Sequence, residues 1–286
     1  MALIDYLKMD FIQYAIVTTI FISLSSALLG VPLVLRRFSF IGDGLSHVAF
    51  FAMAVATALN VILKQINLHI TNDMLVIMPI TIISAILLLR TSNSSKIKGD
   101  QAIALISVGA LSFGYLIMNM FPTTGNVSQD VCTTLFGASS ILTLSFSDVI
   151  ISIVLSTAVI VIFILLYNKI FLVTFDESFA IATGLDANFY NTLLAIITAV
   201  VIVLAMNLVG SLLISALIIF PVISAMRIAN NFKLVTILSC VISVLSTIIG
   251  LILSIIFGTP VGSTIVAIDA LVFVIFYVIG AAKRVV

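Results

Sequence analysis

Nine long apolar segments follow one another along the 286 residues, with only short polar stretches between them. A helix needs about 20 mostly apolar residues to cross the ~30 Å hydrocarbon core of a membrane, whereas a barrel strand has about 10 alternating ones. The segments lie at 11–35, 43–63, 74–90, 101–120, 147–168, 190–206, 208–227, 234–257 and 264–282. They predict an all-α polytopic bundle of nine spans, or eight if the segments that nearly fuse around "MNLVGS" (206–211) form one broken or re-entrant span.

The composition makes lipid the expected solvent of this chain. Hydrophobic residues make up 63% of it and charged residues 8%, against about 45–50% and about 25% in soluble domains. The net charge of +1, without a basic cluster, argues against a nucleic-acid partner. No polar stretch is long enough for a soluble domain, so residues 1–286 are expected to form a single transmembrane domain. The first apolar run exceeds a signal-peptide core, so we expect a span there and not a cleaved leader.

Sequence motifs for enzymatic chemistry are missing. The chain has no G-x-x-x-x-G-K-[ST] for binding ATP, and two histidines without a Ser/His/Asp arrangement. Its two cysteines, Cys132 and Cys240, form no C-x-x-C, which supports neither a disulfide framework nor a thiolate metal site. We therefore expect a protein that is not an enzyme and that carries no permanently bound cofactor.

The basic residues predict the topology, because Lys and Arg collect in cytoplasmic loops. With the N-terminus outside, only Lys8 and Lys64 lie on the outer side. The inner loops then hold the other ten: Arg36, Arg37, Arg90, Lys96, Lys98, Lys169, Arg227, Lys233, Lys283 and Arg284. This assignment requires the sixth and seventh segments to be separate crossings, since a single crossing would invert the C-terminal half.

Labelling of introduced cysteines tests this topology. In a background with Cys132→Ser and Cys240→Ser, a cysteine at Asn126 should react with an impermeant thiol reagent added from outside, and one at Ser94 should not. Labelling of whole cells, compared with labelling after lysis, measures the difference. The reverse pattern would invert the assignment of inner and outer loops.

Asp43 and His47 lie four residues apart at the start of the second apolar segment. On a helix this spacing places both side chains on one face, about 5–6 Å apart at Cβ. A carboxylate oxygen and an imidazole nitrogen suit zinc, and manganese also accepts both. Two ligands are too few for a tight site, but a second copy related by a two-fold axis would make four. Gly42 and Gly44 would allow two backbones to approach closely.

A structural interpretation of the same pair stays open from the residues alone. Asp43 could be the N-cap of a helix, with its carboxylate on free backbone N–H groups. His47 could be a hydrogen-bonded polar residue between helices. Ionisable groups inside membrane segments are costly and point to function by default, so both interpretations are kept. Asp269, inside the last apolar run, and His69, in an outer loop, are weaker candidates of the same kind.

Three blocks of sequence carry a resemblance to a known family. They are "LLGVPLVLRRFSFIGDGLSHVAF" (28–50), "FDESFAIATGLD" (175–186), and "NLVGSLLISALIIFPVISAMRIA" (207–229) followed by "GTPVGSTIV" (258–266). In this order they resemble the permease subunits of bacterial ABC importers for zinc, manganese and iron. The sequence departs from the family's pattern at Asp269 and in the bulky "FFAM" (50–53), which we expect to affect pore width or selectivity.

The resemblance implies a multi-pass permease of the bacterial cytoplasmic membrane with a fold like that of type II ABC importer permeases. It implies a homodimer among membrane lipids, two cytoplasmic ABC ATPase subunits, and an extracytoplasmic metal-binding lipoprotein that delivers the ion. Asp43 and His47 fall on the family's membrane metal-site positions. The metal, zinc or manganese, would be cargo.

The resemblance also implies that segment 175–186 couples the permease to the ATPase. Its candidate coupling residues are Phe175, Asp176, Glu177, Ala180, Gly184 and Asp186. The charge-derived topology independently places this segment inside. The apolar Phe175, Phe179 and Ile181 are expected to dock, and the carboxylates to meet basic residues of the ATPase.

Three alternatives remain at this point. The first is a permease for iron or an iron chelate. The second is a secondary metal transporter or channel that works without an ATPase, against which the coupling-like segment argues. The third is a membrane scaffold, which leaves Asp43 and His47 without a role.

Overall fold

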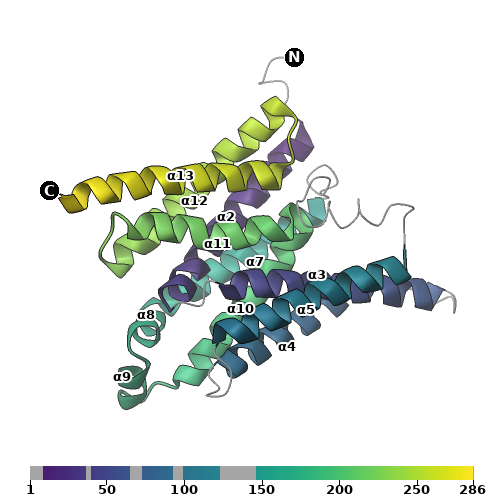
Figure 1. Ribbon diagram of the computed structural model, residues 1–286, viewed down its shortest axis with the longest axis horizontal. Helices are drawn as coiled ribbons and strands as arrows, with labels where there is room; N and C mark the ends of the chain where they lie inside the picture. The colour runs from purple at the N-terminus through teal and green to yellow at the C-terminus, as the bar shows by residue number, and fades with distance from the viewer. Residues whose placement is uncertain (1–8, 37–39, 65–72, 93–98, 123–145, 286) are drawn as a thin grey trace.

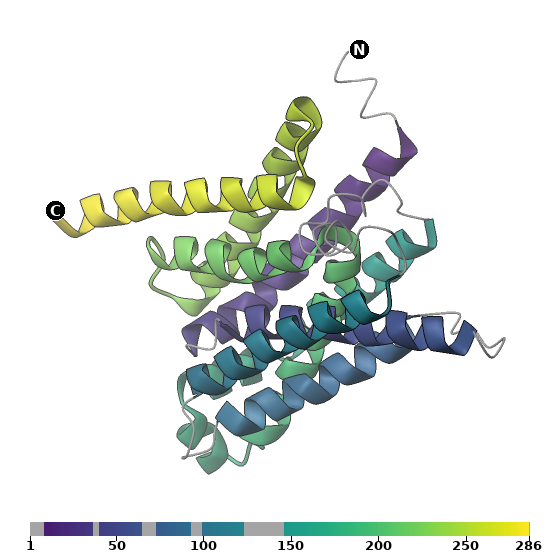
Figure 2. The same ribbon diagram turned by 45° about the vertical axis from the view of Figure 1, so that its right-hand side comes forward.

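The computed structural model describes residues 9–36, 40–64, 73–92, 99–122 and 146–285, and every regular element in these ranges is a helix. The helices are α2 (Asp10–Leu35), α3 (Phe40–Lys64), α4 (Met74–Ser92), α5 (Gly99–Met120), α7 (Phe146–Leu165), α8 (Tyr167–Phe175), α9 (Glu177–Ala182), α10 (Ala187–Val209), α11 (Ser211–Met226), α12 (Phe232–Phe257) and α13 (Val261–Val285). The all-α prediction is confirmed. The bundle is drawn in Figure 1 and, turned, in Figure 2.

Fewer helices have full spanning length than the eight or nine spans predicted. Within the described residues six helices are long and apolar enough, and α7 with α8, bent by 69°, makes a seventh. The apolar helix α11 (Ser211–Met226) is shorter. At 1.5 Å per residue the 16 residues of α11 extend about 24 Å, which is less than the ~30 Å core. Hydropathy overcounts here because it does not register where the backbone breaks.

Gly210 separates the sixth and seventh apolar segments. Its φ of 94° lies in a region that L side chains rarely adopt, and it ends α10 and precedes α11. The chain changes direction sharply between the two helices (Figures 1 and 2). They are therefore separate helices, of which α10 alone has full spanning length.

Described basic residues at the helix ends lie on two opposite sides of the molecule. The C-terminal ends of α2, α11 and α13 lie toward the side that carries α9, and the far ends of α3, α5 and α12 lie opposite (Figure 1). Arg36 and Arg227 cap α2 and α11 on the α9 side, whereas Lys64 ends α3 on the other. This arrangement agrees with the predicted basic asymmetry.

Alanines and glycines let α3 pack tightly within the bundle. Helices in lipid associate through small residues, because apolar burial drives little association there. The buried alanines of α3 are Ala49, Ala52, Ala54, Ala56 and Ala58. Phe50 is fully buried, and a Cβ on Gly114 of α5 would come within 2.9 Å of its ring. The bulky Phe50 that departs from the family pattern therefore fills space between α3 and α5.

Large apolar side chains are exposed on the outer helices. Only 17% of the apolar window of α13 is buried in this chain, and 22% of that of α5. Leu105, Phe113 and Val278 are among these exposed residues. Such faces are stable when hydrocarbon surrounds them, which agrees with a multi-pass membrane protein.

The closest glycine contact lies where α2 crosses α11, and it gives a stability prediction. A Cβ on Gly30 would lie 2.2 Å from the backbone carbonyl oxygen of Ile218. Gly30→Ala should therefore destabilise the protein by about 1–3 kcal/mol, the usual range for overpacking. The temperature at which the detergent-solubilised protein stops being monodisperse measures this loss of stability.

Gly109→Ala is the matched control. It is also a helical glycine, but nothing lies within 4 Å of its added Cβ. We expect a neutral or slightly stabilising effect, since alanine is the better helix former. Equal thermal stability of the Gly30→Ala and Gly109→Ala variants would contradict the close crossing of α2 and α11.

Candidate functional site

The first turn of α3 brings Asp43 and His47 together. His47 Nε2 lies 3.6 Å from Asp43 Oδ2, and the side chains are 14% and 39% exposed, respectively. The helix begins at Phe40, so Asp43 lies inside it and is not its N-cap. Within the described chain its carboxylate accepts a hydrogen bond from a side chain and none from a backbone N–H. The capping interpretation is therefore wrong, and the carboxylate remains free for another role.

A serine of α11 completes the surroundings of the carboxylate. Ser215 Oγ donates to Asp43 Oδ1 at 3.4 Å, and lies 3.3 Å from Ser46 Oγ. Ser46 Oγ in turn donates to the Gly42 carbonyl oxygen at 2.8 Å. Two helices far apart in the sequence thus hold Asp43, α3 through its own backbone and α11 through one hydroxyl.

An apolar groove of about 380 Å³ lies between α11 and α13, and Asp43 and His47 are not among the residues that line it. Ser215 lines it together with residues such as Phe220 and Val266. His47 Nδ1 is buried without a hydrogen-bond partner in the described chain. A buried ring nitrogen without a partner is unusual in a finished site. The pair therefore has unused ligand capacity, and it is connected to the groove only through Ser215.

Asp43 and His47 are not joined by a third candidate metal ligand within the described chain. No group of three or more His, Cys, Asp or Glu side chains that could hold a metal occurs among the described residues. Gly42 and Gly44 do not leave a free approach either, since their added Cβ atoms would meet Ile218 at 3.2 Å and Ile103 at 3.0 Å. The two glycines serve packing within this chain, unlike the role that the sequence suggested.

The candidate coupling segment (175–186) contains the short helix α9 and packs at the end of α8; we call it the α9 bracket. Asp176 is the N-cap of α9, with its carboxylate accepting from the Phe179 N–H at 2.8 Å, and Asp186 caps α10 in the same way. Ala180 is fully buried against α8 and α10 in a small apolar cluster. Phe175, Phe179 and Ile181 are exposed. One face of the α9 bracket thus packs against α8 and α10, and the opposite face exposes apolar side chains.

Gly184 ends α9 in a Schellman motif. Its φ is 86°, the Gly184 N–H donates to the Ile181 carbonyl at 3.0 Å, and the Leu185 N–H donates to the Ala180 carbonyl at 3.0 Å. Leu185 packs against the apolar cluster that holds Ala180, which is the hydrophobic contact that accompanies this motif. Glycine suits this position because the residue that ends the helix has a positive φ, which most L side chains adopt only with strain.

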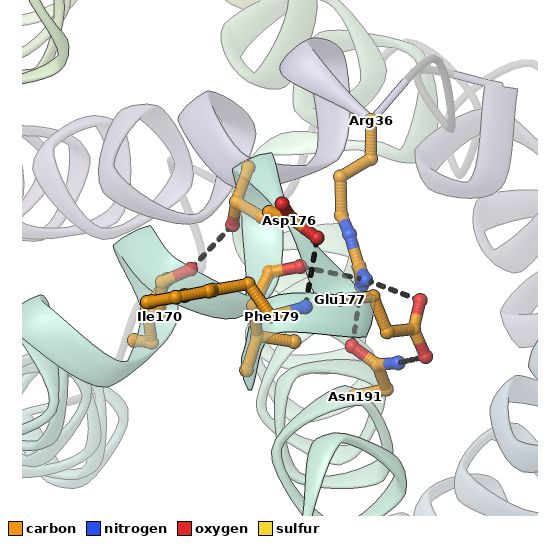
Figure 3. Close-up of polar contacts among 8 residues, drawn as sticks. Arg36, Ile170, Asp176, Glu177, Phe179 and Asn191 are labelled. Atoms are coloured by element: carbon orange, nitrogen blue, oxygen red, sulfur yellow. Dashed lines mark hydrogen bonds and ion pairs between the residues drawn. The ribbon is translucent and has the colours of Figure 1, made fainter. Parts of the chain in front are cut away.

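Glu177 already has partners within the chain. Its carboxylate lies 3.1 Å from Arg36 Nη2, and it accepts from Asn191 Nδ2 at 3.2 Å (Figure 3). Arg36 also donates to the Asn191 side-chain oxygen and, at 3.0 Å, to the Val173 carbonyl. Burial lowers the pKa of the Arg36 guanidinium and Glu177 raises it, and the group remains charged as arginines do in proteins. Glu177 is thus not a free acidic group awaiting an ATPase.

The remaining sequence candidates lie apart from this pair. Asp269 is buried on α13, where the Ser246 hydroxyl donates to its Oδ1 and its Oδ2 has no partner in the described chain. The structure does not gather it with Asp43 and His47 into a group of three ligands. His69 lies outside the described residues.

Sequence reasoning missed Ser215, Arg36 and Asn191 as parts of these sites. Arg36 counted only as an inner basic residue, and Ser215 lay unmarked within the third family block. Asn191 had a visible signal, because it is a polar residue at the start of the apolar run 190–206.

The long apolar helices with exposed apolar outer faces define a multi-pass membrane protein, and the polar pair lies on one of these helices. The chain belongs to the ABC 3 transport family, whose model matches residues 8–280. The family expected from the three sequence blocks is therefore confirmed. A transport family agrees with the expectation that the chain is not itself an enzyme.

Two relatives and one solved structure indicate the range of the family. The "Manganese import system permease protein ScaB" of Streptococcus gordonii is 28% identical over 274 residues, which cover 96% of this chain and 93% of the relative. The "High-affinity zinc uptake system membrane protein ZnuB" of Haemophilus influenzae is 31% identical over 266 residues, 91% of this chain and 94% of the relative. The structure of "PsaBC from Streptococcus pneumoniae in complex with Fab" superposes with a TM-score of 0.80 at 29% identity, over 96% of this chain and 94% of that one.

Proposed function

We propose that this chain is the permease of an ATP-driven importer for a divalent transition metal, zinc or manganese. The observation that carries the proposal is the Asp43–His47 pair, 3.6 Å apart on a membrane helix, with Ser215 of α11 in contact with the carboxylate. Relatives named for manganese import and for zinc uptake support the same cargo. In this proposal Asp43 and His47 are ligands of the ion in transit.

The chemistry of the pair suits an ion that must be released. A carboxylate offsets part of the cost of dehydrating a divalent cation, and an imidazole nitrogen adds affinity for a transition metal over calcium or magnesium. A site with few protein ligands binds modestly, which lets the ion leave. Ser215 would hold the Asp43 carboxylate in place and leave its second oxygen, which faces His47, for the metal.

The proposal includes a second copy of the chain. A single chain offers one Asp–His pair, whereas zinc takes four ligands and manganese more. A two-fold axis near α3 and α11 would bring a second pair to the same ion. The sparsely buried faces of the outer helices leave room for both lipid and a partner.

ATP hydrolysis would occur in two separate cytoplasmic ABC subunits, and an extracytoplasmic lipoprotein would deliver the ion. The exposed Phe175, Phe179 and Ile181 on the α9 bracket support an ATPase contact, since apolar anchors with a polar surround are typical of such interfaces. A secondary transporter would have no use for this bracket. The chain has no ATP-binding loop of its own.

Reconstitution tests the proposal. The permease with its ATPase and binding lipoprotein, in proteoliposomes, should accumulate radioactive manganese or zinc only when ATP is supplied. The permease alone should not. Competition among manganese, zinc and ferrous iron would identify the cargo. Uptake by the permease alone would favour the secondary transporter, and selective uptake of iron or an iron chelate would favour that alternative.

A further inference from the structure

Arg36 joins four helices at the inner end of the bundle. It follows α2 directly, and its guanidinium contacts the Val173 carbonyl of α8, Glu177 of α9 and Asn191 of α10 (Figure 3). The Arg36 side chain is only 12% exposed, and Asn191 is buried. Charge-assisted hydrogen bonds from a guanidinium are among the stronger polar contacts, and losing Glu177, which is 42% exposed, would leave the largely buried Arg36 charge without its carboxylate partner. The contacts therefore form a firm junction.

The α9 bracket has few other attachments. Ala180 packs with Val173 of α8 and Ala187 of α10, and this small cluster is the apolar anchor of α9 in the described chain. None of these contacts reaches α2. The ion pair of Arg36 with Glu177 is a direct link from α9 to α2.

The α2 end stands next to both elements that hold Asp43. The chain continues from Arg36 to α3, which begins at Phe40, and Asp43 lies in the first turn of that helix. Earlier in α2, Gly30 lies against the Ile218 carbonyl of α11, about one turn beyond Ser215. A shift of the α2 end would therefore act on the carboxylate from two directions, through α3 and through the Ser215 hydroxyl.

We infer that Arg36 is a positioning residue that transmits movement of the α9 bracket to the Asp43–His47 pair. It does not touch the ion. The inference rests on the proposed function, because it presupposes an ATPase that moves α9 and a metal that the pair binds. When the ATPase displaces α9, the Arg36 junction would carry the displacement into α2. The metal pair would then change geometry in step with the nucleotide cycle.

The test measures metal transported per ATP hydrolysed by the complete complex in proteoliposomes. Arg36→Gln and Glu177→Gln each keep a polar side chain but remove the ion pair. Each should lower the ratio at least about tenfold, the usual effect of losing a charge-assisted contact, while ATP hydrolysis and the amount of assembled complex stay near wild type. Because both variants break one link, the double variant should lose no more than the worse single one.

Arg227→Gln is the matched control. Arg227 is also a capping arginine on the α9 side of the molecule, but its guanidinium stacks on Tyr277 of α13, 4.7 Å from the ring centre. Its replacement should leave the ratio unchanged. An equal fall for Arg227→Gln, an unchanged ratio for Arg36→Gln, or full additivity in the double variant would overturn the inference. If Arg36→Gln fails to assemble, Glu177→Gln alone decides: a normal ratio overturns the link, and a lowered one supports it.

The same assay separates this inference from the proposed function. If the wild-type complex transports no manganese or zinc with ATP, the proposed function fails. If the wild-type complex does transport metal and the Arg36 and Glu177 variants keep its ratio, only the link through Arg36 fails.

Discussion

Asp43→Asn should abolish uptake of manganese or zinc while leaving the protein assembled in the membrane. Asparagine has the size of aspartate and still accepts a hydrogen bond from Ser215, so the packing between α3 and α11 should persist. What it loses is the negative charge, which in the proposed site would offset part of the cost of dehydrating a divalent cation. We expect at least a hundredfold fall in the initial uptake rate, on the order of 3 kcal/mol in binding the ion in transit.

His47→Ala should have an equally large effect on uptake. In the proposed site the imidazole would be the nitrogen ligand, and its Nδ1 has no partner in the described chain whose loss would weaken the fold. The size of the assembled permease fraction, measured by immunoblot and size-exclusion chromatography, should match that of wild type. Radioactive-metal uptake in the same preparations supplies the comparison.

Asp73→Asn is the control for a removed carboxylate. Asp73 lies at the start of α4, exposed, with Asn60 donating to it from the end of α3. Its neutralisation should leave uptake near wild type. Wild-type transport by Asp43→Asn would show that the charge is not needed, and the pair would then be structural.

The sequence predicted well what depends on local spacing. Residues four apart on a helix share a face, so the proximity of Asp43 and His47 followed once 43–63 was assigned as helical. The family blocks and the order of the apolar segments were visible for the same reason, since they are contiguous in the chain. The uneven distribution of Lys and Arg predicted which helix ends lie on the same side of the molecule. This prediction needs only the number of basic residues in each loop and no knowledge of contacts.

Contacts between distant segments could not be predicted in this way. Ser215 reaches Asp43 across 172 positions, and Arg36 reaches Glu177 across 141. Nothing local marks such partners, because they are fixed by how α2, α8, α9 and α11 pack. The break at Gly210 was visible as a glycine, but its positive φ was not, and hydropathy therefore overestimated the number of full spans.

The position of Glu177 changes how the coupling segment is interpreted. The sequence suggested that its carboxylate meets the ATPase, whereas in this chain it is bonded to Arg36 and Asn191, with its side chain 42% exposed. If the proposed function holds, we expect the ATPase to dock on the exposed apolar side chains of Phe175, Phe179 and Ile181. The charged Glu177 instead attaches the α9 bracket to Arg36 of the same chain. In this proposal the apolar residues of the segment contact the ATPase. Its charged Glu177 transmits the movement to α2.

Gly184→Val should uncouple ATP hydrolysis from metal uptake. The Gly184 φ of 86° ends α9, and a β-branched residue is strained there by about 1–2 kcal/mol. Nothing lies within 4 Å of an added Cβ, so the effect would come from the backbone and not from a clash. Relief of this strain would open the turn that seats Leu185 and reorient the apolar face of α9. We expect uptake to fall at least about tenfold with ATP hydrolysis retained, measured on the reconstituted complex.

Gly184→Asn is the matched variant, because asparagine adopts left-handed backbone conformations more readily than valine does. It should keep most of the uptake, although its side chain is as large. Glu177→Lys, which sets a second cation beside Arg36, should fail like Gly184→Val, since both changes release α9 from its seat. Normal uptake in both Gly184→Val and Glu177→Lys would remove the coupling role from this segment. If Gly184→Asn loses as much uptake as Gly184→Val, the backbone conformation of the turn is not the cause. The ATPase contact would then be disturbed by the bulk of the added side chain.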